Sequence, residues 1–147
     1  MVRGGGDFTF LTSGSTLSLV SDSVNDVDGG SGAHGIVLYG IDENRQSQVE
    51  VVLLNGTTPV VTTSLWLGLN RVALFRSGSS QANEGKITAT AVTGGSVQAA
   101  MPAGEGTTQQ AIFFTQAGHT ALTTGLMMNC TKLSGGGVPK VTFKAWV

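Results

Sequence analysis

Three aspartates near the N-terminus are the residues best placed, by type and spacing, to bind a metal ion. They lie in the stretch Asp22–Asp28, which two glycines follow. An EF-hand calcium loop needs oxygen ligands at alternate positions and a glutamate at its twelfth position. Aligning the second and third aspartates with that pattern puts Val24 first and Gly35 last, so neither end supplies a ligand. We expect a solvated turn, with a looser calcium site at Asp22–Asp28 as the alternative.

Two histidines could act as general bases or metal ligands. His34 and His119 each adjoin a glycine in turn-like sequence and lie far apart along the chain. Ser-His-Asp catalysis needs a nucleophile on a strained turn, and the sequence contains no Gly-x-Ser-x-Gly elbow. Glu84 and Glu105 are loop acids, and a glycosidase-type carboxylate pair would be set by space rather than by sequence. We expect surface turns at both histidines and no catalytic residue, so the chain is predicted not to be an enzyme.

A single cysteine limits the remaining chemistry. Cys130 has no second cysteine with which to form an intramolecular disulfide or a cysteine-based zinc site. Its neighbours Met127 and Met128 favour a small buried hydrophobic residue over a reactive thiol. The glycine-rich stretches Gly4–Gly6 and Gly135–Gly137 match neither the phosphate loop nor the dinucleotide fingerprint. We expect no bound metal and no cofactor.

The composition favours a protein that packs against neighbours. Charged residues make up only 12% of the 147 residues, and the net charge is −1. That share is about half of the roughly 25% typical of soluble domains. Serine, threonine and glycine are abundant instead, and neutral hydroxyls cost much less to dehydrate than charges do. The surface is therefore suited to burial in an assembly.

Charge and hydropathy also argue against other classes of partner. Lysine and arginine are scattered singly, without the basic stripe that captures nucleic acid phosphates, so we expect no direct nucleic acid binding. No apolar run reaches the roughly 18 residues of a membrane-spanning helix, and Met1–Gly6 lacks the apolar core of a secretion signal. We expect a soluble chain that is made in the cytoplasm and does not insert into membranes.

Apolar residues recur at spacing two along most of the chain, which predicts strands. The clearest case is Lys140–Val147, where apolar and polar residues alternate. Turn residues predict a hairpin at Asp42–Arg45 and a turn with positive φ at Leu54–Thr57, and Ser77–Gly85 is typical of an exposed loop without a core anchor. The other predicted strands are Asp7–Leu11, Thr16–Val20, Gly35–Ile41, Gln48–Leu54, Val60–Ser64, Arg71–Arg76, Lys86–Val92, Ser96–Met101, Gln110–Gln116 and Thr120–Cys130.

About ten strands in a chain of this length predict an all-β protein. The expected architecture is an antiparallel β-sandwich, jelly-roll-like, with little or no helix. Residues 1–6 are expected to form a flexible N-terminal arm, and residues 7–147 a single β-sandwich domain.

Two predicted strands are apolar on both faces. Gly35–Tyr39 and Val51–Leu54 are either central strands covered from both sides, or strands with one face against another subunit. Trp66 poses the same choice, and core packing is the preferred interpretation because an indole is usually buried within its own domain. Trp146 interrupts the polar face of the last predicted strand. The candidate interface residues are Ile36, Leu38, Tyr39, Val52, Leu54, Trp66 and Trp146.

Several segments resemble small virion structural proteins of tailed bacteriophages. The likeness is carried mainly by turns and strand edges and covers most of the chain. Its segments are Ser21–Asp42, Val49–Val60, Leu69–Val72, the loop Ser77–Gly85 with the following Lys86–Thr88, Met101–Gly106 and the turn Ala117–Ala121.

The resemblance implies a β-sandwich component located on the capsid or tail of a virion. Its leading form is a capsid decoration or cement protein, a homotrimer that binds the major capsid protein or other virion proteins and so stabilises the head by mass action. One alternative is a glycan-recognising module of a tail or fibre, in which Trp66 or Tyr39 near Asn70 and Arg71 would form the sugar platform. Another is a head-to-tail or tail connector subunit.

Overall fold

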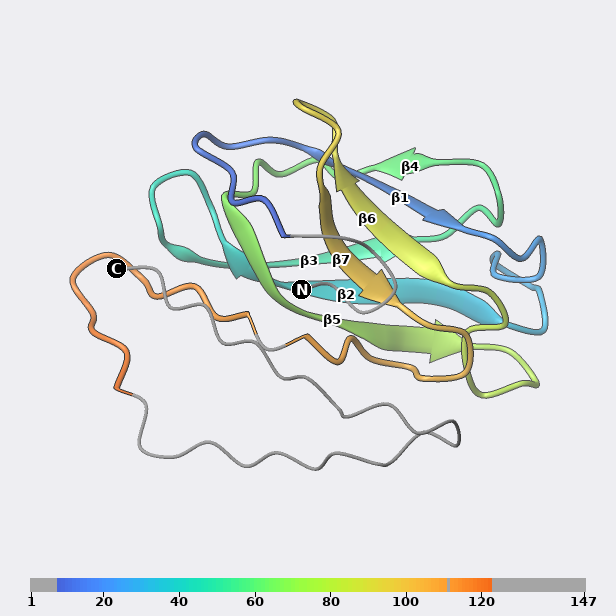
Figure 1. Ribbon diagram of the computed structural model, residues 1–147. Helices are drawn as coiled ribbons and strands as arrows, with labels where there is room; N and C mark the ends of the chain where they lie inside the picture. The colour runs from blue at the N-terminus through green and yellow to red at the C-terminus, as the bar shows by residue number, and fades with distance from the viewer. Residues whose placement is uncertain (1–7, 111, 123–147) are drawn as a thin grey trace, which may run out of the picture.

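Two antiparallel sheets face each other in the computed structural model, which describes residues 8–110 and 112–122 (Figure 1). These residues form seven strands and no helix. Within this part of the chain, no helix is therefore present that could cross a lipid bilayer. The predicted all-β antiparallel sandwich is confirmed.

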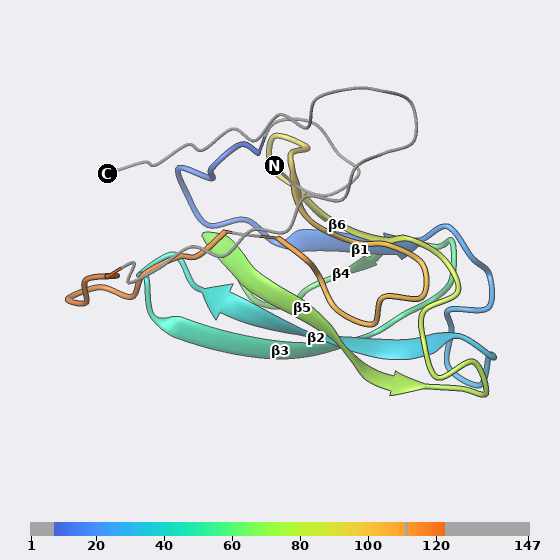
Figure 2. The ribbon, with the colours of Figure 1, turned by 60° about the horizontal axis from the view of Figure 1, so that its bottom comes forward.

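One sheet has four strands in the order β4-β1-β6-β7, and the other has three in the order β3-β2-β5 (Figure 2). All pairs of neighbouring strands are antiparallel. The four-stranded sheet contains β1 (Leu17–Ser21), β4 (Val60–Val61), β6 (Ile87–Ala91) and β7 (Val97–Met101). The three-stranded sheet contains β2 (Ala33–Ile41), β3 (Ser47–Leu53) and β5 (Gly68–Ser77).

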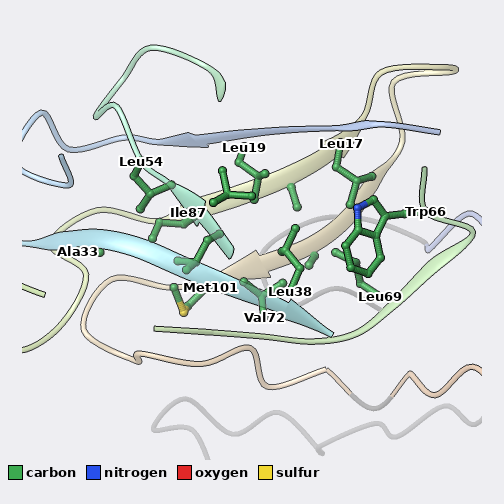
Figure 3. Packing of buried hydrophobic residues seen from close by; sticks show 14 of the residues in the cluster. Leu17, Leu19, Ala33, Leu38, Leu54, Trp66, Leu69, Val72, Ile87 and Met101 are labelled. Atoms are coloured by element: carbon green, nitrogen blue, oxygen red, sulfur yellow. The ribbon is translucent and has the colours of Figure 1, made fainter. Parts of the chain in front are cut away.

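The hydrophobic core lies between the two sheets (Figure 3). Alternate residues of a strand point to the same face, so β1 and β6 each turn every second side chain inward. The facing sheet supplies Ile36, Leu38 and Val72, and Trp66 fills one end of the core. Buried members of the cluster include Leu17, Leu19, Ile36, Leu38, Trp66, Leu69, Val72, Ile87 and Met101.

Local turn chemistry explains how the β2–β3 hairpin closes. The Asp42 carboxylate accepts hydrogen bonds from the amides of Asn44 (2.9 Å) and Gln46 (2.7 Å), and Arg45 has a positive φ of 59°. The predicted hairpin turn is therefore confirmed. The second predicted turn is confirmed as well, because Gly56 adopts a φ of 58° that a residue with a side chain rarely tolerates.

Residues 8–110 and 112–122 contain seven strands, fewer than the ten predicted for the whole chain. Residues 8–11, 110 and 112–116 form no strand, and the predicted strand at Val60–Ser64 shortens to Val60–Val61. Residues 106–110 and 112–114 instead run beside β5, held by side chains, two main-chain hydrogen bonds and one isolated bridge rather than by a continuous ladder. The expected arm, the strand at 140–147 and most of Thr120–Cys130 lie outside the described residues.

The loop Ser77–Gly85 is anchored, contrary to the sequence prediction. Asn83 is only 1% exposed, and its side-chain amide donates to the carbonyls of Gly85 (2.7 Å) and Pro102 (2.8 Å). Its side-chain oxygen accepts the amide of Gly106 at 3.0 Å. A polar residue thus ties this loop to the chain that leaves β7, an anchor that a hydropathy pattern cannot reveal.

Candidate assembly surface

Four of the predicted interface residues are core residues. Ile36 and Leu38 on β2 are 0% exposed, and Val52 and Leu54 are 5% and 3% exposed. They point toward the four-stranded sheet and cannot contact a partner in the folded domain. The prediction that they form an interface is therefore wrong.

The sequence of β3 does not show which of its two faces turns inward, because Glu50 lies on the same face as Val52. A polar residue in an alternating strand ordinarily points to solvent, which would turn Val52 outward as well. Glu50 points inward instead, because its carboxylate accepts the amide of Thr63 (2.8 Å), the hydroxyl of Thr63 (2.9 Å) and the amide of Ser64 (3.2 Å). Burial raises the pKa of Glu50, but these hydrogen bonds together outweigh burial and hold the pKa below its usual value.

Trp66 also belongs to the core and not to an interface. Its side chain is 0% exposed and lies beside Leu17 and Leu69 (Figure 3). The amide of Trp66 donates to the carbonyl of Ser15 at 2.8 Å, and the amide of Ser15 donates to the carbonyl of Trp66 at 3.0 Å. This pairing holds the segment that carries Trp66 against the four-stranded sheet. The preferred interpretation from the sequence is thus confirmed, and Trp66 is withdrawn from the interface candidates. Trp146 lies outside the described residues.

The opposite face of the three-stranded sheet exposes a group of large apolar side chains. Tyr39 is the one predicted interface residue that lies there, with 39% of its surface exposed. The others are Val49 (59%), Val51 (45%) and Leu53 (52%) on β3 and Phe75 (59%) on β5. We call Tyr39, Val49, Val51, Leu53 and Phe75 the outer apolar face.

Cross-strand pairing brings the members of the outer apolar face together. Tyr39 pairs with Val49, and Val37 of β2 pairs with both Val51 and Ala73. Val37 and Ala73 are each 8% exposed, so two buried apolar side chains lie among the exposed ones. Contiguous apolar surface of this kind marks interaction sites on soluble proteins.

Charged residues are confined to the ends of this face. At one end, the Arg71 guanidinium lies 6.0 Å from the centre of the Tyr39 ring. At the other end, Arg76 pairs with Asp28 from the loop before β2. Both arginines are exposed, so they can stay hydrated while the apolar side chains between them are covered.

The three aspartates of Asp22–Asp28, the alternative calcium site, point to different partners. Asp22 accepts the amide of Lys86 at 2.6 Å, Asp26 is buried, and Asp28 pairs with Arg76. No group of three acidic, histidine or cysteine side chains suited to a metal ion occurs among residues 8–110 and 112–122.

Asp26 is 0% exposed and organises the end of the sandwich. Its two oxygens accept the hydroxyl of Ser21 (2.5 Å) and the amides of Ala33 (2.7 Å), Glu84 (2.9 Å) and Gly85 (2.9 Å). The carboxylate therefore joins three separate segments of the chain. This is a structural task and leaves no oxygen directed at solvent.

The two histidines do not share a site. His34 is the second residue of β2, where its Nε2 lies 2.7 Å from the carbonyl oxygen of Gly30 and its Nδ1 lies 3.8 Å from Asp28. His119 borders Gly40 and Ile41 at the other end of the same strand.

An open hollow of about 820 Å³ lies at that end of the molecule. Its lining includes Asn70, Phe113, Phe114, Gln116 and His119. Asn70 is already engaged, since its side-chain oxygen accepts the amide of Phe114 at 2.5 Å and its nitrogen donates to the carbonyl of Phe114 at 3.3 Å. Phe113, at 73% exposed, is the aromatic ring that is open to a ligand.

Comparison with known proteins adds no relative to this picture. No protein family profile, no curated protein and no solved structure matches the chain. The function must therefore be argued from the surfaces of the molecule.

Proposed function

We propose that this chain is a non-enzymatic structural protein of a bacteriophage virion, which decorates the capsid and stabilises it by binding assembled capsid subunits. The observation that carries the proposal is the outer apolar face, where five large apolar side chains lie exposed on one side of a rigid sheet. The scarcity of charge in the sequence and the resemblance to phage virion proteins support it. A partner that binds only the assembled shell shifts the equilibrium toward assembly.

The test compares two exposed apolar residues. Phe75→Ser changes the outer apolar face, whereas Val24→Ser changes a loop residue that is 69% exposed and lies off that face. We expect Phe75→Ser to weaken cosedimentation with capsids of the virus that encodes the chain at least tenfold, and Val24→Ser to leave it unchanged. Equal binding by all three proteins, or absence of the chain from images of the virion, would reject the proposal.

A second candidate function is recognition of a cell-surface glycan by a tail or fibre. The open hollow supports it, because Phe113 offers an exposed ring beside the polar side chains of Gln116 and His119. The platform expected from the sequence does not, since Trp66 is buried and Asn70 is bonded to Phe114. Glycan array binding that is lost in Phe113→Ala but kept in Phe75→Ser would favour this function over capsid decoration.

A further inference from the structure

The main chain of β3 is open along one side. In an antiparallel pair, alternate residues exchange hydrogen bonds with the neighbouring strand. Leu54 donates its amide to His34 and Asp42 donates to Gln46, both at 2.9 Å, so the bonded positions of β3 are the even-numbered ones. The amides and carbonyls of Val49, Val51 and Leu53 consequently face away from β2.

These groups have no partner within residues 8–110 and 112–122. The segment after β4 lies close to β3, but Thr63 and Ser64 bond to the Glu50 side chain and leave the main chain uncovered. β3 is the outermost strand of its sheet, as Figure 2 shows. It therefore presents a free edge.

The other edge of the same sheet is protected. Leu74 of β5 donates to the carbonyl of Gly106 at 2.7 Å, and the amide of Thr108 donates to the carbonyl of Val72 at 2.8 Å. The chain after β7 thus covers β5, whereas β3 carries no such cover in the described part of the chain. An exposed apolar edge strand that is not blunted in this way is a template for pairing with another strand.

The unpaired groups require an extended chain as partner, and β3 is complementary to itself. With a two-fold axis at Val51, each Val51 lies opposite its counterpart and each Val49 lies opposite Leu53 of the second copy. This register forms about six main-chain hydrogen bonds, two for each of three residue pairs. It also places the exposed side chains of these residues against one another on the outer apolar face.

We infer that β3 pairs antiparallel with β3 of a second copy and joins the two three-stranded sheets into one continuous sheet. The inference goes beyond the proposed function, which concerns binding to capsid subunits, because it gives a geometry for contact between two copies of the chain. An isologous contact of this kind joins copies in pairs. The protein therefore forms dimers, or trimers that are linked to one another in pairs. A homotrimer without such links would leave the β3 edge of each copy unpaired.

Glu50 opposes this pairing only weakly. Charged side chains that point inward on an edge strand ordinarily discourage edge pairing. Here the Glu50 carboxylate already accepts three hydrogen bonds from its own chain, so a neighbouring strand does not leave it unpaired. In the two-fold register, each Glu50 lies opposite Val52 of the other copy and only diagonal to the second Glu50.

Disulfide trapping tests the register in a Cys130→Ser background. Val51→Cys places two sulfur-bearing residues about 5.5 Å apart between Cα atoms, within the span of a disulfide. Val49→Cys is the matched control, because its counterpart lies about 14 Å away, four residues along the strand at about 3.4 Å each. We expect mild oxidation to give covalent dimers with Val51→Cys and with the double variant Val49→Cys/Leu53→Cys, and none with Val49→Cys alone.

A proline substitution tests the hydrogen bonds. Val51→Pro removes an amide that faces away from β2, so the internal ladder stays intact. We expect the dimer dissociation constant, measured by sedimentation equilibrium, to rise about tenfold or more because the dimer loses two main-chain hydrogen bonds. Val51→Thr keeps the amide and should change the dimer dissociation constant by no more than about twofold.

Two results would overturn the inference. One is the absence of a Val51→Cys dimer in a protein that still self-associates. The other is a monomer in which the Val51 amide is protected from hydrogen exchange, because another part of the same chain would then cover the edge. Either result leaves capsid binding untouched. Conversely, a paired β3 in a chain that does not bind capsids would refute only the proposed function.

Discussion

At the scale of single residues, the polar side chains that the fold buries determine how its loops connect. Asp26 and Asn83 are 0% and 1% exposed, and each bonds to main-chain groups from more than one segment. A buried polar group without a partner is costly, so such residues fix the positions of the loops that satisfy them. Hydropathy patterns do not register these residues, because their partners are set by the folded chain.

Removing the Asp26 carboxylate should destabilise the domain. Asp26→Ala leaves the amides of Ala33 and Gly85 and the hydroxyl of Ser21 buried without an acceptor. Each such group costs about 1–3 kcal/mol, so we expect a loss of about 3 kcal/mol or more in the free energy of unfolding, measured with urea. Asp28→Asn, on the same loop but exposed, should cost less than about 1 kcal/mol. Similar losses in both variants would contradict the role of Asp26.

Glu50 should make stability depend on acid pH. Its folded pKa lies below the ordinary value of 4.5, so its contribution is fully present above pH 4.5 and is lost as the pH falls through the folded pKa. Glu50→Gln should accordingly be less stable than the natural protein at neutral pH, with the difference shrinking toward zero in acid. Urea unfolding of both proteins between neutral and acid pH measures this difference in stability. A difference that stays constant or grows in acid would contradict the assignment.

At the scale of elements, the sequence predicts strands well and their orientation less well. The period of two places β1, β2, β3, β5, β6 and β7 close to their observed bounds, since alternation depends only on neighbouring residues. Which face turns inward on β3 depends on Thr63 and Ser64, which are distant in sequence from Glu50. The candidate site was therefore misplaced by one residue, onto Val52 and Leu54.

The correct register can be tested with two substitutions. Leu38→Ala on β2 removes a fully buried side chain and should cost about 2–5 kcal/mol in the free energy of unfolding. Val49→Thr on β3 changes a side chain that is 59% exposed and should change stability by no more than about 0.5 kcal/mol. Chemical denaturation measures both. A large loss of stability in Val49→Thr, with little loss in Leu38→Ala, would show that the inward and outward faces have been assigned the wrong way round.

At the scale of the whole molecule, the distribution of charge sets the kind of contact the surface can make. The chain has 12% charged residues and a net charge of −1, and the outer apolar face carries arginines only at its ends. Contacts through this face would be dominated by apolar burial, and contacts through the β3 edge by main-chain hydrogen bonds. Such contacts respond little to ionic strength, because salt screens mainly exposed charges.

Self-association should therefore persist in high salt. We expect the mass measured by sedimentation to be the same at low and at high sodium chloride concentration. Val51→Pro should reduce that mass at both concentrations, while Val24→Ser should not. Dissociation by salt in the natural protein would show that ion pairs, and not paired β3 edges, hold the copies together.

The strand order of the four-stranded sheet also affects how the protein is made. β1 is synthesised before every other strand, yet its neighbours β4 and β6 follow much later in the chain. Pairings between distant segments form slowly, because a long loop must close first. The β2–β3 hairpin has no such delay. A growing chain would thus display its hairpin, with the β3 edge free, before Ala91 has emerged to complete β6. Synthesis on the ribosome is accordingly the stage at which aggregation is the greatest hazard and a chaperone most useful.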